Sequence, residues 1–216
     1  QELSIIRKEL KKFSPDRVVW DIEDLSKQPP WGNDISKDIT DLSNYDRFNK
    51  KSLRKMISYK EKLNTIKTVI LDVDGVLTDG NLILLPSGEM VRTMNTRDGY
   101  AMQLAIKQGI RIAVITGGRD EAVVNRLKYL GLTDIYVNRR DKVEAFEDLL
   151  FSYGLDPDEI AYMGDDYPDL AVMNLVGLAC CPNDACMDVR KAAEYISPQN
   201  GGKGCVRDLL EQILKA

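Results

Sequence analysis

Thr68-Val69-Ile70-Leu71-Asp72-Val73-Asp74-Gly75-Val76-Leu77-Thr78 joins an apolar strand to two carboxylates placed one residue apart. Side chains at alternate positions of an extended backbone point to the same side, so Asp72 and Asp74 are expected to face one cation. Gly75 allows the chain to turn away behind them. Two carboxylates this close raise the pKa of one of them, and a bound divalent metal keeps both ionised. The stretch therefore predicts a site for phosphate chemistry at the end of a buried strand.

The composition favours one main domain that acts on a small molecule. The chain has 216 residues and a formal net charge of -4, which gives no electrostatic footprint for nucleic acid or an anionic membrane. No apolar run approaches the length of a membrane span, and a cytoplasmic enzyme is expected.

The chain contains no histidine, which excludes a Ser-His-Asp triad, a His-ligated zinc and a histidine general base. Carboxylates are therefore the expected general acids and bases. The four cysteines have no metal-ligand spacing and are expected to be buried thiols: Cys180, Cys181, Cys186 and Cys205.

From about Lys62 onward, short apolar runs alternate with helical patterns, which is typical of βαβ units. The predicted fold class is α/β, a Rossmann-like parallel sheet with helices on both faces. The expected strands are residues 66–71, 110–115, 135–137, 160–163 and 178–181, and helices are expected to end at Gly109, Gly131 and Gly154, with a further helix after residue 205. Ligands of such sheets bind at the carboxyl ends of the strands, so Asp72, Thr116 and Asp165 are expected to converge.

Residues 81–95 predict a β-hairpin that turns at Pro86-Ser87-Gly88-Glu89. Its arms carry apolar side chains on both faces, which a lone hairpin cannot bury. We expect the hairpin to pack against another subunit.

Residues 1–60 show no regular alternation of strands and helices and carry no chemistry that we can identify. Apolar spacing near the start predicts a short amphipathic helix, and several aromatic residues favour partial docking. A structural or disordered role is the favoured interpretation. The expected organisation is an N-terminal extension of unknown role, residues 1–60, followed by a catalytic domain, residues 61–216.

The run from Asp72 to Thr78 resembles the first motif of the haloacid dehalogenase superfamily of aspartate-nucleophile phosphohydrolases, and three further motifs follow in that family's order. Thr116 matches the second motif, Lys142 the third, and Gly164-Asp165-Asp166 with Asp169 the fourth. Each motif alone has an ordinary alternative, such as a surface turn, a solvated lysine or a helix cap. The shared order favours the family.

The resemblance implies the chemistry. Asp72 would attack phosphorus, and Asp74 would protonate the leaving group and then activate water. Thr116 and the N–H groups of Gly117 and Gly118, expected at the start of the next helix, would bind phosphoryl oxygens.

The resemblance also implies a Mg²⁺ site. The ion would be held by the carboxylates of Asp72 and Asp165 and by the backbone carbonyl of Asp74. Lys142 would offset negative charge, and Asp166 and Asp169 would orient water or Lys142.

The stretch from about Tyr59 to the end resembles one branch of the superfamily, the 3-deoxy-D-manno-octulosonate 8-phosphate phosphatases of the lipopolysaccharide precursor pathway. Its markers are Leu77-Thr78-Asp79-Gly80, residues 94–100 and Gly201-Gly202-Lys203-Gly204. That branch has a hairpin as its only cap and forms homotetramers with active sites at subunit boundaries. The glycine-rich segment would then lie beside a neighbour's active site, or else form a flexible loop.

By the same resemblance, residues from the start of one helix would line the sugar-phosphate pocket: Asn95, Thr96, Arg97, Asp98 and Gly99. Arg97 is the expected carboxylate clamp, with a surface ion pair as the alternative. Arg126 would reach the acid or phosphate group of the substrate.

Two departures from the family pattern concern the substrate. Many members have Arg directly after Thr-Gly, whereas here Gly118 precedes Arg119. The second contact to an anionic group of the substrate is therefore expected from Arg119 or is absent. Gln103 stands where some members have Arg. A nine-carbon sugar acid 9-phosphate, of neuraminate or its deaminated analogue, is therefore an alternative substrate. An alternative of another class is a non-catalytic oligomerisation module, like the domain attached to some sialic acid cytidylyltransferases.

Overall fold

The computed structural model describes residues 58–216. Residues 1–57 of the expected N-terminal extension, with the predicted amphipathic helix and the aromatic residues, lie outside the described residues.

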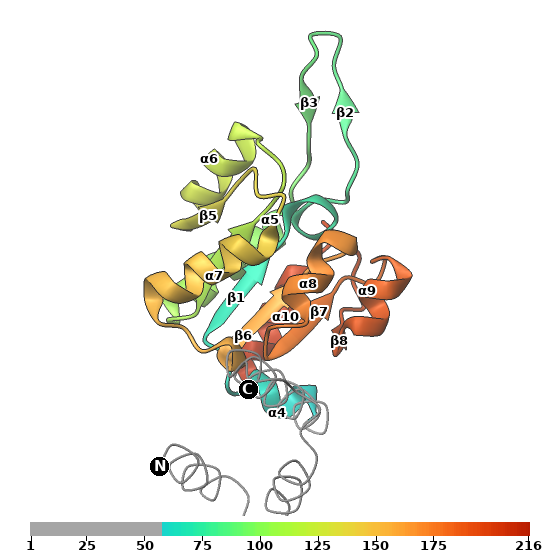
Figure 1. Ribbon diagram of the computed structural model, residues 1–216. Coiled ribbons are helices and arrows are strands. Elements are labelled where there is room, and N and C mark those ends of the chain that lie inside the picture. Colours follow the sequence, from blue (N-terminus) through green and yellow to red (C-terminus); the bar gives the residue numbers. More distant parts are fainter. Residues whose placement is uncertain (1–57) are drawn as a thin grey trace, which may run out of the picture. The chain divides into compact units, whose positions relative to one another are not determined.

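The core is a six-stranded parallel sheet with the strand order β5-β4-β1-β6-β7-β8 (Figure 1). The strands are β1 (Thr68–Leu71), β4 (Arg111–Ile115), β5 (Asp134–Tyr136), β6 (Ile160–Met163), β7 (Leu178–Cys181) and β8 (Tyr195–Ile196). β1 lies between β4 and β6 and pairs with both in parallel. The predicted α/β fold class is confirmed.

The strand limits differ slightly from the prediction. β1 and β4 begin later than expected, and β5 begins one residue earlier. The prediction missed β8, since two residues at a sheet edge are too few to produce an apolar pattern.

Helices cover both faces of the sheet. One core cluster joins the sheet to α5 (Thr96–Lys107), α6 (Glu121–Tyr129) and α10 (Cys205–Lys215), and the other joins it to α7 (Lys142–Tyr153), α8 (Leu170–Met173) and α9 (Met187–Ala192). Along β1, Val69 and Leu71 belong to the first cluster and Ile70 to the second. Burial on both faces explains why the strand is apolar throughout instead of alternating.

The helix limits follow from capping. Side-chain oxygens of Asn95, Asp120 and Asp141 accept backbone N–H groups at the starts of α5, α6 and α7. Gly154 ends α7 in the left-handed conformation, with φ 60°, as predicted. The remaining short helices are α4 (Tyr59–Leu63), the 3-10 turns η2 (Pro157–Glu159) and η3 (Tyr167–Asp169), and the wide turn η1 (Val73–Leu77).

The predicted hairpin is present as β2 (Ile83–Leu84) and β3 (Met90–Val91) and projects away from the sheet (Figure 1). The Leu85 N–H donates to the Glu89 carbonyl across its turn, at 2.9 Å. Apolar side chains along both arms are exposed, and Leu84 reaches 72%. Packing of this surface against another subunit stays a prediction.

All four cysteines lie within the described part of the chain and are free thiols, three of them buried and Cys186 partly so. Among residues 58–216, no helix combines the length and apolarity required to cross a membrane.

Candidate active site at the carboxyl ends of the strands

Loops that follow neighbouring strands bring the motif residues together. Asp72 directly follows β1, and its N–H donates to the Met163 carbonyl at the end of β6, at 3.0 Å. Asp165 lies two residues beyond β6, and Thr116 directly follows β4. Lys142 begins α7 and lies against Asp72. The site therefore forms where the parallel strands end, as expected for this sheet.

Lys142 is a buried cation held between two carboxylates. Its Nζ lies 3.0 Å from Asp72 Oδ1 and 2.7 Å from Asp169 Oδ1. Burial alone lowers the pKa of an ammonium group, but the charges of Asp72 and Asp169 outweigh it, so the pKa of Lys142 is raised. Lys142 is therefore charged at neutral pH and partly neutralises Asp72.

Asp169 is saturated with hydrogen bonds. Its Oδ1 accepts from Lys142 Nζ at 2.7 Å and from the Tyr162 hydroxyl at 2.6 Å, while its Oδ2 accepts the N–H groups of Asp165 and Asp166 at 3.0 and 3.2 Å. A carboxylate offers about four acceptor positions, and all four are in use. Asp169 therefore orients Lys142 and shapes the loop that carries Asp165.

Tyr162 was missed by sequence reasoning. It is fully buried in the centre of β6, among apolar neighbours, and its hydroxyl donates to Asp169. A tyrosine in an otherwise apolar, buried strand needs a partner for its hydroxyl, and that requirement is the signal that could have identified it.

Asp72 and Asp165 form the part of the site that could hold a metal ion. Carboxylate oxygens of Asp72, Asp165 and Asp169 all lie within 4.8 Å of one another. Because Asp169 is saturated, the open positions belong to the other two residues. Asp165 Oδ1 is buried and has no hydrogen-bond partner within residues 58–216. Hard oxygen donors in this arrangement suit a small divalent cation.

The pKa values of Asp72 and Asp165 agree with a metal site at these two residues. Burial raises the pKa of Asp72 to about 6, against the opposing effect of Lys142. Burial, followed by the charges of Asp72, Asp169 and Asp166, raises the pKa of Asp165 to about 7. A cation between the two carboxylates would stabilise their ionised forms and so lower both pKa values.

Gly75 is required beside this pair for two reasons. Its φ is +85°, and an added Cβ would lie 2.0 Å from Asp165 Oδ2. A side chain at this position would therefore strain the backbone and displace a metal-binding carboxylate.

The expectation that the side chains of Asp72 and Asp74 face one cation is wrong. Arg92, just after β3, donates from Nε to Asp74 Oδ1 at 2.7 Å and from Nη2 to Asp74 Oδ2 at 3.2 Å. The Asp74 carboxylate is thereby turned toward the hairpin. Sequence reasoning missed Arg92, because only the tertiary structure brings it to Asp74. A metal contact through the Asp74 backbone carbonyl stays a prediction.

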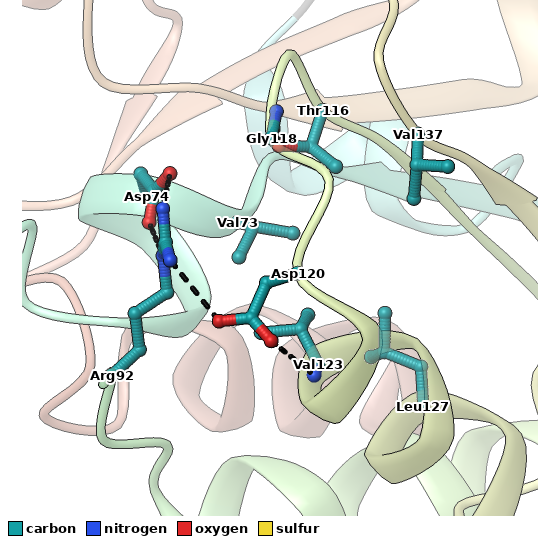
Figure 2. Close-up of a pocket in the computed structure, with 9 residues that line it drawn as sticks. All are labelled: Val73, Asp74, Arg92, Thr116, Gly118, Asp120, Val123, Leu127 and Val137. Carbon is teal, nitrogen blue, oxygen red and sulfur yellow. Dashed lines mark hydrogen bonds and ion pairs between the residues drawn. The ribbon is translucent and has the colours of Figure 1, made fainter. Parts of the chain in front are cut away.

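A small pocket lies beside Asp74 (Figure 2). Its polar side carries Asp74, Arg92, Asp120, Thr116 and Gly118, and the rest of its wall is apolar: Val73, Val123, Leu127 and Val137. The pocket thus joins the first and second motifs to the base of the hairpin.

The glycines after Thr116 do not begin a helix, contrary to the prediction. The Gly118 N–H donates to Thr116 Oγ1 at 3.1 Å, and α6 begins only at Glu121. Asp120 Oδ1 accepts the N–H groups of Ala122 and Val123 there, at 2.9 and 3.3 Å. An aspartate is a strong N-cap, so it takes the place that an anion would occupy. Gly117 is exposed beside Thr116.

Asp98 is not placed to bind substrate, and this prediction is corrected. It is only 1% exposed, and its Oδ1 accepts the Arg207 N–H in the first turn of α10, at 2.7 Å. Burial raises the pKa of Asp98. Asp98 therefore ties α5 to α10.

The other predicted pocket residues differ in their exposure. Thr96 and Arg97 are exposed at the start of α5. Asn95 caps that helix and donates from Nδ2 to the Gly202 carbonyl at 3.2 Å. Gly99 is buried against Arg126, whose Nη2 would lie 3.0 Å from an added Cβ.

Arg119 is exposed and donates to Asn138 Oδ1 at 2.6 Å. The structure therefore gives this arginine a protein partner at the rim of the second motif.

Residues 201–204 lie against their own chain, and their expected place beside a neighbour's active site stays a prediction. The Gly202 N–H donates to the Val76 carbonyl at 2.9 Å, and an added Cβ on Gly201 would lie 1.9 Å from the Gly75 carbonyl oxygen. Two adjacent glycines allow this close approach of backbone to backbone. The segment therefore supports the turn η1 from behind.

Comparisons with known proteins match two parts of the chain to different families. The family model of haloacid dehalogenase-like hydrolases matches residues 128–209, and the model of Immunity protein 70 matches residues 1–67. The 3-deoxy-D-manno-octulosonate 8-phosphate phosphatase KdsC of Escherichia coli (strain K12) is 39% identical over 155 residues, which cover 72% of this chain and 82% of that protein.

Solved structures of related phosphatases share the fold. The 3-deoxy-D-manno-octulosonate 8-phosphate phosphatase of Yersinia pestis has 36% identity and a TM-score of 0.71, covering 72% of this chain and 84% of that one. The enzyme of Moraxella catarrhalis, solved with a magnesium ion, a phosphate ion and KDO, has 35% identity and a TM-score of 0.70, covering 72% and 90%. This chain therefore belongs to the haloacid dehalogenase-like hydrolases, in the branch of the 3-deoxy-D-manno-octulosonate 8-phosphate phosphatases.

Proposed function

We propose that this protein is a Mg²⁺-dependent phosphatase that hydrolyses 3-deoxy-D-manno-octulosonate 8-phosphate to the free sugar acid and phosphate. The observation that carries the proposal is the buried Asp72 carboxylate, held 3.0 Å from Lys142 and next to the unpartnered oxygen of Asp165 in the described residues. The substrate follows from the names of the relatives, which match most of residues 58–216.

The proposed reaction has two steps. In the first, an Asp72 oxygen bonds to phosphorus, the bond from phosphorus to the sugar oxygen breaks, and Asp74 gives that oxygen a proton. In the second, water attacks phosphorus, Asp74 takes its proton, and the bond to Asp72 breaks to release phosphate. Lys142 stays beside Asp72 and stabilises negative charge in both steps.

Asp72 and Asp165 would hold the metal, with Asp169 and Asp166 shaping its surroundings. When bound, Mg²⁺ supplies positive charge that lets an anionic phosphate approach Asp72. Thr116 contributes its hydroxyl beside the same loop, while the N–H of Gly118 is already engaged with it.

We also propose that the catalytic domain spans residues 61–216 and works as a cytoplasmic homotetramer. The exposed apolar arms of the hairpin support assembly, because they offer surface that a partner subunit would bury.

A substrate panel tests the proposed function. Phosphate release with Mg²⁺ is measured for 3-deoxy-D-manno-octulosonate 8-phosphate, a nine-carbon sugar acid 9-phosphate and a hexose 6-phosphate, ranked by kcat/KM. We expect the eight-carbon acid to rank first and Asp72→Asn to lower kcat at least about 10³-fold. The control is Asp188→Asn, at a carboxylate in an exposed ion pair with Lys191. A preference for hexose phosphate would overturn the substrate, and an active Asp72→Asn would overturn the mechanism.

A further inference from the structure

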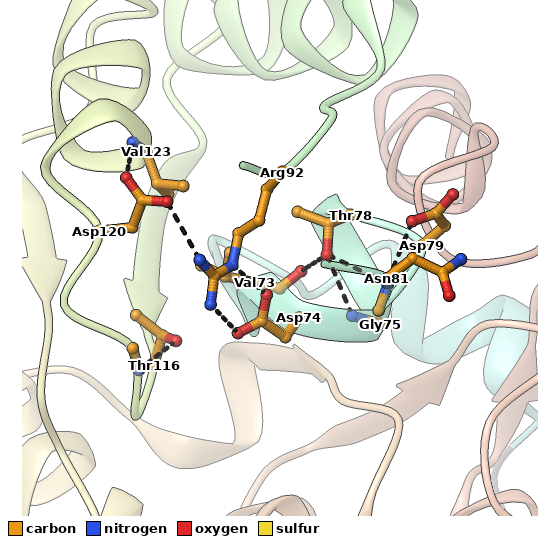
Figure 3. A network of polar contacts seen from close by, with 12 residues as sticks. Val73, Asp74, Gly75, Thr78, Asp79, Asn81, Arg92, Thr116, Asp120 and Val123 are labelled. Atoms are coloured by element: carbon orange, nitrogen blue, oxygen red, sulfur yellow. Dashed lines mark hydrogen bonds and ion pairs between the residues drawn. The ribbon is translucent and has the colours of Figure 1, made fainter. Parts of the chain in front are cut away.

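Arg92 links three separate elements at the edge of the pocket (Figure 3). Its Nε and Nη2 donate to the two carboxylate oxygens of Asp74 after β1, at 2.7 and 3.2 Å. Its Nη1 donates to Asp120 Oδ2 before α6, at 3.1 Å. Arg92 itself stands on the arm of the hairpin that leaves β3.

The contacts of Arg92 with Asp74 and Asp120 are partly shielded from solvent. The side chain of Arg92 is 12% exposed, that of Asp120 21% and that of Asp74 42%. A two-pronged pair between guanidinium and carboxylate fixes direction as well as distance, unlike a single contact between flexible surface charges. Arg92 therefore determines which way the Asp74 carboxylate points.

Asp120 anchors Arg92 to a rigid element. One of its oxygens caps α6 through the N–H groups of Ala122 and Val123, and the other holds Arg92. Asp120 is thus fixed by the helix that it begins.

The Asp74 carboxylate is held next to the second motif. A Cβ added to Gly118 would lie 3.8 Å from Asp74 Oδ2 and 3.4 Å from Thr116 Oγ1, so both groups border the same small space. Both Asp74 oxygens are occupied by Arg92 in this arrangement. Arg92 uses one acceptor position on each oxygen, so Asp74 can exchange a proton through the remaining positions while Asp120 holds the guanidinium in place.

We propose that Arg92 is a positioning residue that holds the Asp74 carboxylate at the pocket and couples the hairpin to proton transfer by Asp74. The inference rests on the proposed function, in which Asp74 is the acid and base. It assigns Asp120 the task of holding Arg92 in place beside Asp74.

The test compares two substrates that differ in their need for a proton donor. A sugar phosphate releases an alkoxide, which must be protonated, whereas p-nitrophenyl phosphate releases a stable phenolate. We expect Arg92→Ala to lower kcat about 10- to 100-fold on the sugar phosphate and less than about 3-fold on p-nitrophenyl phosphate, with little change in KM. Arg92→Lys should recover part of the loss, since it restores charge without the second prong.

Two further variants test the role of Asp120 and provide a control. Asp120→Asn keeps the oxygen that caps α6 but cannot accept from Arg92 at the other atom, so it should show a weaker form of the same substrate-dependent loss. Thr93→Ala, at the exposed neighbouring position of the same arm, is the matched control and should behave as wild type.

Each other outcome overturns the inference. Equal losses of kcat on both substrates, in step with a lower Tm, would make Arg92 merely structural. A raised KM with unchanged kcat would make it a substrate ligand, and wild-type kinetics in Arg92→Ala would remove any role. A wild-type protein inactive on both substrates would instead overturn the proposed function, and this inference with it.

Discussion

At the scale of single residues, the site depends on the contrast between a buried aspartate and a half-buried one. Asp169 uses all its acceptor positions on Lys142, Tyr162 and two backbone N–H groups, so it serves as a fixed support. Asp165, four residues earlier, keeps a buried oxygen without a partner among the described residues. Buried polar atoms are normally satisfied, and an exception at such a position indicates a ligand.

The raised pKa values of Asp72 and Asp165 predict how the stability of the metal-free protein depends on pH. In the folded protein they lie at about 6 and about 7, compared with the ordinary value of 3.8. Across that window the folded state binds more protons than the unfolded state, so these two groups make stability fall as the pH rises. Added Mg²⁺ should reduce the fall, because it stabilises the ionised carboxylates.

Thermal unfolding in a chelator, compared with Asp165→Asn, measures this effect. The variant cannot ionise at this position, so its Tm relative to wild type should increase by a few degrees as the pH rises from 3.8 through 7. A difference in Tm that stays constant or reverses sign would contradict the assigned titration.

At the scale of elements, the turn η1 packs against a glycine from a distant part of the chain. Gly201 lies against the carbonyl of Gly75, and Gly75 lies against the carboxylate of Asp165. The loop before α10 thus supports the metal-binding pair through two backbone contacts, although it contributes no side chain to the site.

Gly201→Ala should therefore reduce activity from outside the site. Its Cβ would lie 1.9 Å from a backbone oxygen, so η1 must shift, at a cost of about 1–3 kcal/mol in the free energy of unfolding. We expect a loss of kcat/KM together with weaker Mg²⁺ binding.

Gly109→Ala is the matched control for this substitution. Gly109 has φ +89°, and no atom lies within 4 Å of an added Cβ, so its cost is local backbone strain of about 1–2 kcal/mol. Activity should survive there at a similar loss of stability. Equal activity in both variants, measured below their unfolding temperatures, would show that residues 201–204 do not support the site.

At the scale of the whole molecule, the hairpin exposes apolar side chains that the rest of residues 58–216 does not cover. Leu84 is 72% exposed, and Leu82, Ile83, Leu85, Met90 and Val91 are exposed around it. A contiguous apolar surface of this kind is typical of an interface between subunits.

Leu84→Lys should lower the oligomeric state, because a charge cannot be buried in an apolar interface without a partner. Sedimentation velocity of both proteins at matched concentration measures the change. Phe151→Lys, at an aromatic residue on α7 that is 92% exposed, is the control and should assemble as wild type. Unchanged assembly of Leu84→Lys would move the interface away from the hairpin.

The sequence by itself determined the parallel sheet, the order of the motifs and the presence of the hairpin. These features depend on local patterns: apolar runs, helix spacing, caps such as Gly154 and glycine-rich turns. Asp72, Thr116, Lys142 and Asp165 could be named in advance, because each follows a strand or begins a helix that the pattern predicts.

Only the tertiary structure decided which partners the side chains take. Asp74 pairs with Arg92 instead of facing a cation beside Asp72, and Asp98 binds the backbone of Arg207, 109 residues away in sequence. Residues 201–204 support η1 of their own chain. Contacts between such distant segments leave no periodic trace in the sequence, since they form only after the sheet and its two layers of helices have brought the loops together.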